Sequence, residues 1–393
     1  MRRIAFFVGV LLPNLLLVAS QDLCARGPLQ PRNEPICSAN TYVAKHEKHE
    51  NTLENSPEEW DGPDDCVEEH CIFSHQTFGG GMVMITTERI AEIVAGLNAV
   101  DDAGSKAPPF RIAQFPGKGM GLVATRAIRK GEIIMERTPS LLVQWGMLLE
   151  MDPEIRDRLF ALAVERLPAL KKQAFMRQMG DSIHDKVDRN TFRLFLDGNS
   201  GQSTHLGSFP EISMMNHDCR PNVHYRIANI THTTVAVRDI LPGEELTISY
   251  IFGMIPRHER HERLIDWGFT CTCPHCTMSP ADLAASDARL EEIKRLEDDL
   301  ETKLGSGRTV APEAGGDIVK LYLDEKLYSY LGPAYTRAAL VYSMFGNMDK
   351  AKEYAAEAAE ALVRETGPQS KDAEAMRKLV DDPTKHWSWQ VQL

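Results

Sequence analysis

Four cysteines have the spacing of a metal site. Cys271, Cys273 and Cys276 form a Cys-x-Cys-x-x-Cys cluster, and Cys219 lies far upstream. Four thiolates suit a tetrahedral zinc ion, and such a closed site has no open position for water, so the ion would be structural. Two disulfides are the alternative, but Cys271 and Cys273 are too close in sequence to pair comfortably. The sequence therefore favours structural zinc.

Asn216 and His217 lie just before Cys219, separated from it by Asp218, in the motif Asn-His-Asp-Cys-Arg-Pro-Asn, residues 216–222. An asparagine side chain offers amide donors and a carbonyl acceptor, which suits the edge of an adenine or an amino-acid group. An asparagine that stabilises a loop is the alternative. Taken alone, these residues leave both interpretations open.

A glycine-rich turn, Gly-Lys-Gly-Met-Gly at residues 117–121, precedes an expected strand. Missing side chains let a ligand approach the backbone, although the same pattern also serves a plain hairpin turn. No Gly-Lys-Ser or Gly-Lys-Thr follows, which excludes a P-loop, and no long βαβ pattern follows, which disfavours a dinucleotide fold. Tyr250 ends a later strand that follows Gly243-Glu244-Glu245. A tyrosine there most often packs with its hydroxyl paired, so its role depends on context.

The elements that must position these residues are short strands and helices. Apolar alternation with turn signals predicts strands over 110–143, and a hairpin over 223–237 that turns at 229–232. Helical spacing predicts a helix over 86–100, a helical subdomain over 146–197, and helices after Cys276. These patterns together indicate an α+β protein.

The amino-terminal residues have the layout of a secretory signal. Arg2 and Arg3 precede an apolar run, and small residues precede Gln21. A membrane anchor is the alternative, but the run is shorter than the roughly 20 residues that a span needs, and we expect no stable membrane anchor. The polar residues 21–109 are expected to form a solvated, partly mobile arm. Their four cysteines could form two disulfides in three possible pairings, with free thiols or a metal as alternatives; they are Cys24, Cys37, Cys66 and Cys71.

The formal net charge of -12 argues against direct binding to nucleic acid, which needs clustered Lys and Arg. An acidic surface favours a basic partner. A lysine-bearing protein fits that description.

The order of four motifs resembles the SET methyltransferase domain with its post-SET zinc segment, from about Arg111 to Cys276. The motifs are the glycine turn, the Asn-His motif, Gly-Glu-Glu-Leu-x-Ile-x-Tyr and Phe-x-Cys-x-Cys-x-x-Cys. The helical insert and tail resemble the SET-and-MYND branch and its fungal relatives, although the Cys/His pattern of a MYND zinc finger is missing. The resemblance implies an α+β SET fold of short β-sheets. Its expected parts are a signal peptide at 1–20, a cysteine-containing polar region at 21–109, a SET domain at 110–253 with a helical insert at about 146–205, a post-SET zinc segment at 254–279 and a helical region at 280–393.

The resemblance also implies roles for single residues. S-adenosylmethionine would be held by the backbone of Lys118, Gly119 and Met120 and by the side chains of Asn216 and His217. Phe269 would stack near the adenine, and Asn190 would lie near the cofactor. Tyr250 would be the active-site tyrosine, and the zinc ligands would be Cys219, Cys271, Cys273 and Cys276.

The implied activity is S-adenosylmethionine-dependent N-methylation of lysine in a protein. Two departures are Asp218, where a small serine is usual, and Phe252-Gly253 after Tyr250. Because a carboxylate beside the cofactor loop could weaken binding, a non-catalytic secreted or lumenal interaction protein on the same scaffold is the alternative. The signal-like residues and the sequon Asn229-Ile230-Thr231 indicate the secretory pathway. Zinc thiolates and a methyl donor instead suit the nucleus or cytoplasm.

Overall fold

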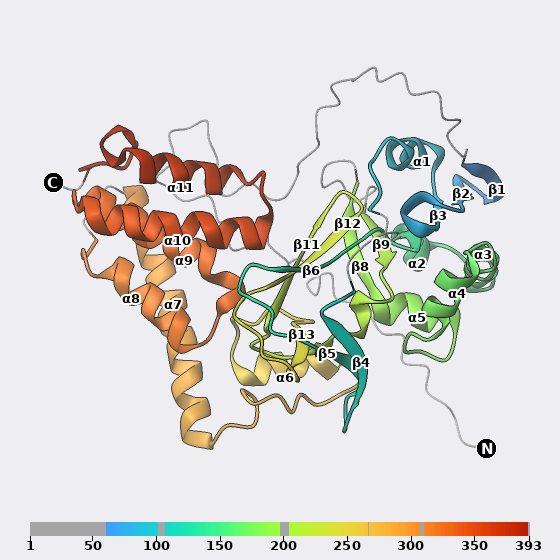
Figure 1. Ribbon diagram of the computed structural model, residues 1–393, viewed down its shortest axis with the longest axis horizontal. Helices are drawn as coiled ribbons and strands as arrows, with labels where there is room; N and C mark the ends of the chain where they lie inside the picture. The colour runs from blue at the N-terminus through green and yellow to red at the C-terminus, as the bar shows by residue number, and fades with distance from the viewer. Residues whose placement is uncertain (1–59, 101–106, 197–203, 266, 307–309, 392–393) are drawn as a thin grey trace. The chain divides into compact units, whose positions relative to one another are not determined.

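The computed structural model describes residues 60–100, 107–196, 204–265, 267–306 and 310–391 (Figure 1). It divides into two compact units. Within the described residues, the first, called the sheet unit, spans 60–249 and 361–369, and the second, called the helical unit, spans 250–360 and 370–391. The expected α+β class is confirmed. The predicted signal peptide, Cys24 and Cys37 lie outside the described residues.

Three sheets build the sheet unit, with strand orders β1-β2-β3-β7-β9-β8, β10-β13-β5-β4 and β11-β12-β6. The strands are β1 Asp61–Val67, β2 His70–His75, β3 Met82–Thr86, β4 Phe110–Phe115, β5 Gly119–Ala124, β6 Ile133–Arg137, β7 Leu141–Gln144, β8 Thr191–Phe195, β9 Thr204–Ser208, β10 Asn216–His217, β11 Val223–Ala228, β12 Thr231–Ala236 and β13 Glu245–Ile248. The helices of this unit are α1 Glu88–Ala95, α2 Gly146–Glu150, α3 Pro153–Glu165, α4 Ala169–Met176 and α5 Ile183–Asn190.

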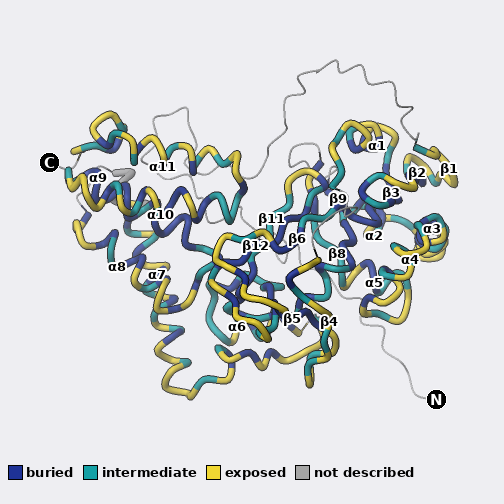
Figure 2. The backbone as a smooth tube through the Cα atoms, viewed as in Figure 1, coloured by how far each residue is buried: buried dark blue, intermediate teal, exposed yellow. Residues whose placement is uncertain are grey.

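Helices of the insert share one hydrophobic core with the six-stranded sheet. Val83 and Ile85 of β3 are fully buried with Phe160 of α3, Phe175 of α4 and Val187 of α5. Burial of each such side chain contributes about 1.5–3 kcal/mol relative to exposure. Figure 2 shows this dark interior beneath the exposed outer turns of α3 and α4. Packing against the sheet therefore fixes the insert.

The expectation of a solvated arm over 21–109 is wrong for its described part. Strands β1, β2 and β3 extend the largest sheet, and β3 pairs in parallel with β7. All residues of β3 are buried, so this strand lacks the alternation of buried and exposed positions that marks a half-exposed strand. Cys66 and Cys71 form a disulfide across the β1–β2 hairpin. This is one of the pairings that the spacing left open.

Other expected elements agree with the structure except at their ends. The β11–β12 hairpin is confirmed, and Asn229 at its turn has a φ of 52°, which asparagine tolerates better than most residues. The helix expected over 86–100 is shorter in the structure, where α1 begins at Glu88 and ends at Ala95. Helical structure expected to 197 ends at Asn190, since Thr191–Phe195 pairs with β9 as an edge strand.

The helical unit contains α6 Arg257–Ile265, α7 Pro280–Ser306, α8 Ala314–Asp324, α9 Leu331–Met344, α11 Lys371–Asp381 and the larger part of α10 Met348–Thr366. Every residue of α9 except Arg337 is buried. Arg337 forms an ion pair of 2.9 Å with Glu297 of α7, whose carboxylate also accepts a hydrogen bond from Tyr322 of α8. The expected helical tail is therefore a packed bundle. Among the described residues, no helix is both long and apolar enough to cross a membrane.

Candidate active site and metal centre

The glycine-rich motif forms the tight turn between β4 and β5. Gly117 and Gly119 have φ values of 75° and 80°, which favour glycine, and Lys118 N donates to Phe115 O at 3.1 Å. A Cβ atom built on either glycine would have no atom within 4 Å. The backbone of the turn therefore faces open space and can be approached by a ligand.

Asn216 lies directly against this turn. It begins β10, which pairs in parallel with β13, and β13 in turn pairs with β5. Its Nδ2 donates to Met120 O at 3.3 Å and to Glu245 Oε1 at 2.8 Å. A Cβ on Gly121 would come within 2.6 Å of the same Nδ2, so the close approach requires glycine. The sheet thus brings together two motifs that lie far apart in sequence.

Glu245 connects these two motifs, and sequence reasoning assigned it no role. Its Oε2 pairs with Lys118 Nζ at 2.6 Å while Oε1 accepts from Asn216. The pair is mostly shielded, with side-chain exposures of 27% for Lys118 and 15% for Glu245. The only sequence signal was its place in the Gly-Glu-Glu motif, where a solvated carboxylate is equally ordinary. The carboxylate fixes the side chains on which a ligand would rest.

Asn222, the last residue of the Asn-His motif, is a second residue without an assigned role. It is buried, its Nδ2 donates to Glu245 O at 2.8 Å, and its Oδ1 accepts from Thr247 N at 2.9 Å. The Asn222 side chain thus bonds to backbone groups of β13, as the backbone of a neighbouring strand would. Asn222 therefore positions Glu245.

His217 and Asp218 are engaged within their own loop. His217 is buried with Nε2 3.3 Å from Cys219 Sγ, so it is placed beside the cysteine cluster, and its contact with a cofactor stays a prediction. Asp218 Oδ1 accepts from Arg220 N at 2.8 Å. The carboxylate that departs from the family pattern thus caps the loop that presents Cys219.

Asn190 is positioned by contacts inside the insert. Its Nδ2 donates to Met179 O and to Lys186 O, both at 2.8 Å. The bond to Met179 joins the end of α5 to the preceding loop, and the bond to Lys186 lies within α5. Its predicted place beside a cofactor stays a prediction.

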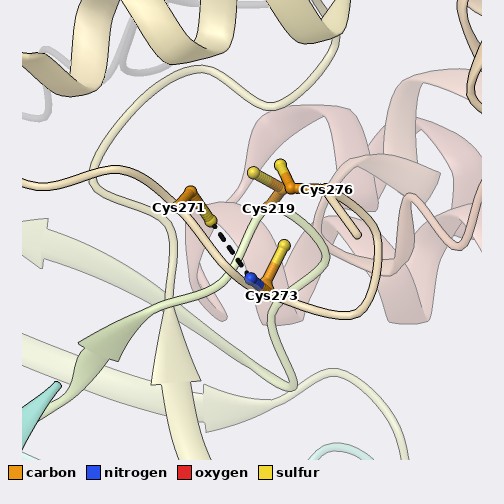
Figure 3. Close-up of side chains that lie close together, drawn as sticks. All are labelled: Cys219, Cys271, Cys273 and Cys276. Atoms are coloured by element: carbon orange, nitrogen blue, oxygen red, sulfur yellow. Dashed lines mark hydrogen bonds between the residues drawn. The ribbon is translucent and has the colours of Figure 1, made fainter. Parts of the chain in front are cut away.

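The four predicted metal ligands lie together. Cys219, Cys271, Cys273 and Cys276 are buried and form no disulfide, and their sulfur atoms all lie within 4.8 Å of one another (Figure 3). A tetrahedral zinc with bonds of about 2.3 Å needs sulfurs about 3.8 Å apart, which is close to this arrangement. Four buried thiolates would repel one another without a cation. The cluster can therefore hold zinc, and its donor set leaves no position for a substrate.

Tyr250 of the helical unit packs in an aromatic group with two residues near the cysteines. Its ring centroid lies 4.8 Å from that of Trp267 and 6.2 Å from that of Phe269, which meets it edge-on. Phe269 is 37% exposed. Sequence reasoning missed Trp267, because a lone tryptophan is more often a core residue. The structure joins Tyr250 and Phe269, which were predicted separately, in one apolar surface.

Comparison with known proteins gives matches over part of the chain. Residues 119–251 match the SET domain. The chain is 42% identical over 89 residues to the N-lysine methyltransferase SMYD2 of Homo sapiens, a match that covers 22% of this chain and 21% of that protein. It is 38% identical over 104 residues to SMYD2-A of Danio rerio, which covers 24% of each. The matches thus span about a fifth to a quarter of these relatives.

Proposed function

We propose that this chain, whose residues 119–251 form a SET domain, is an S-adenosylmethionine-dependent protein-lysine N-methyltransferase. One observation carries the proposal: Glu245 joins Lys118 of the glycine turn to Asn216 of the Asn-His motif. An open backbone turn with a fixed polar rim thus lies at the start of the region that matches the SET domain. The likeness to N-lysine methyltransferases supports the same reaction.

The residues present suit the proposed cofactor. The open backbone at Gly117 and Gly119 admits close approach, and the Asn216 amide and Glu245 carboxylate supply polar partners beside it. When bound, S-adenosylmethionine supplies a methyl group carried on a sulfonium. Phe269, partly exposed, offers a ring on which an adenine can stack.

The remaining work is to orient and desolvate a lysine amine. In the proposed reaction the amine arrives neutral, and the Tyr250 hydroxyl orients its lone pair and stabilises charge that develops on nitrogen. The Trp267 ring packed on Tyr250 helps to desolvate the amine and attracts a lysine head through its face. The net charge of -12 favours a basic protein substrate. A peptide array would identify the substrate.

Zinc bound by the four cysteines belongs to the same proposal. Cys219 follows the cofactor motif, and Cys271 follows Phe269 by two residues. Zinc at the cluster would therefore fix both segments without taking part in the transfer.

Replacing Asn216 by alanine is expected to weaken S-adenosylmethionine binding on the order of tenfold to a hundredfold. The change removes a polar partner at the turn and leaves Glu245 without one of its hydrogen bonds. Calorimetric titration of the zinc-loaded chain measures the effect, and Asn98→Ala, at an exposed position, is the matched control. If the unmodified chain gives no heat of S-adenosylmethionine binding, the proposal of an enzyme is wrong, and the alternative of a non-catalytic interaction protein is favoured.

We further propose that the chain enters the secretory pathway. The Cys66–Cys71 disulfide suits an oxidising compartment, and the sequon asparagine Asn229 is exposed at the β11–β12 turn. Glycosidase treatment of the native protein is expected to lower its mass, and Asn229→Gln should abolish the shift. An untreated mass equal to that of the bare chain would instead favour the nucleus or cytoplasm.

A further inference from the structure

The short segment between the last zinc ligands is anchored to the carboxy-terminal helices by a buried polar network. His275 lies between Cys273 and Cys276, and its Nε2 is 3.1 Å from Ser286 Oγ of α7. Ser286 donates to Glu325 Oε2 at 2.9 Å, and the same oxygen lies 3.6 Å from His275 Nε2. Residues 271–276 are called the cysteine loop below. One face of this loop therefore rests on α7 and on the end of α8.

Glu325 is the centre of this network. Its side chain has no solvent exposure, and its Oε1 accepts from Nε and Nη2 of Arg289 at 2.7 and 2.6 Å. A buried carboxylate is costly unless it is paired and hydrogen-bonded, and here both oxygens have partners. Removing any partner therefore leaves a buried charge incompletely satisfied, which costs stability.

A second link holds the end of the cysteine loop. Arg257, at the start of α6, donates from Nε to Cys276 O at 3.2 Å, and its backbone N donates to Asp287 Oδ1 at 3.0 Å. Asp287 directly follows Ser286 on α7. One turn of α7 thus fastens both His275 and, through Arg257, the carbonyl of Cys276.

We propose that Glu325 is a positioning residue for the metal centre: through Ser286 and His275 it holds the cysteine loop in its ligating shape, so the carboxy-terminal helices slow zinc loss. Residues that orient metal ligands from outside typically change metal affinity about 10- to 100-fold. The inference rests on zinc binding and is independent of methyl transfer.

The test is the rate at which a chromophoric chelator removes zinc from the full chain. Glu325→Gln is expected to release zinc about tenfold faster or more, and Ser286→Ala, a smaller change, should also release it faster, with a fall in the unfolding midpoint no larger than that of Glu297→Gln. The matched control is Glu297→Gln, on the same helix as Ser286, which breaks the ion pair with Arg337 of α9 but touches no residue of the cysteine loop.

The control separates positioning from general loosening. Faster release in Glu325→Gln and Ser286→Ala, with wild-type release in Glu297→Gln, supports the proposal. Equal release from all chains, or equal acceleration in Glu297→Gln, overturns it. Metal analysis of the unmodified chain tests a different point, because a chain without zinc would refute the metal site itself and not only the role of Glu325.

Discussion

Replacement of Cys271 by serine is expected to lower the zinc content from one ion per chain to nearly none, and to lower the unfolding midpoint by about 10 °C or more. Serine is not ionised at neutral pH, so three buried thiolates would remain around an open coordination position. Structural zinc contributes about 10–16 kcal/mol of apparent binding free energy in small domains, and losing even several kcal/mol shifts the midpoint by this amount in a domain of 150–250 residues.

Metal analysis and thermal unfolding under reducing conditions measure both effects. The control is the double variant Cys66→Ser, Cys71→Ser, which removes two sulfurs at the β1–β2 hairpin instead of the cluster. It should keep its zinc, and its unfolding midpoint should stay close to that of the unmodified chain, whose Cys66–Cys71 disulfide is also reduced under these conditions. Full zinc retention by Cys271→Ser would contradict the tetrathiolate site.

The parts of this site that the sequence predicted are those with few alternative explanations. A Cys-x-Cys-x-x-Cys cluster has a narrow range of chemistry, and the β11–β12 hairpin is encoded by local alternation and an Asn turn. Strand β3 was missed in part because its pairing with β7 is non-local. Strand β3 is buried throughout and pairs in parallel with β7, so its local pattern carries no period-two signal.

The sequence missed several site residues for a different reason. Glu245, Asn222 and Trp267 belong to types that are common on surfaces, in loops and in cores, so only their partners show their roles. Glu245 becomes informative when Lys118 and Asn216 are seen on either side of its carboxylate. Glu325 is similar, because nothing in its local sequence indicates contact with His275. Function at these positions depends on tertiary contacts that no local pattern encodes.

Replacement of Tyr250 by phenylalanine is expected to lower kcat for peptide methylation on the order of 100- to 1,000-fold, the usual cost of removing one oriented hydroxyl or amide from a reacting centre. The change deletes only the hydroxyl. The ring keeps its packing on Trp267 and Phe269, so the fold should be unchanged. Because the hydroxyl is proposed to act mainly on the amine in the transition state, KM should change far less than kcat.

Steady-state methylation, calorimetric titration of S-adenosylmethionine and thermal unfolding together identify the cause. Tyr250→Phe should keep cofactor binding and its unfolding midpoint, which assigns the loss to the reaction itself. Tyr354→Phe is the matched control, because its ring stacks on Tyr342 within the helical bundle and takes no part in the proposed site. A Tyr250→Phe chain that methylates at the wild-type rate would remove the hydroxyl from the reaction, and the amine would then have to be oriented by backbone carbonyls alone.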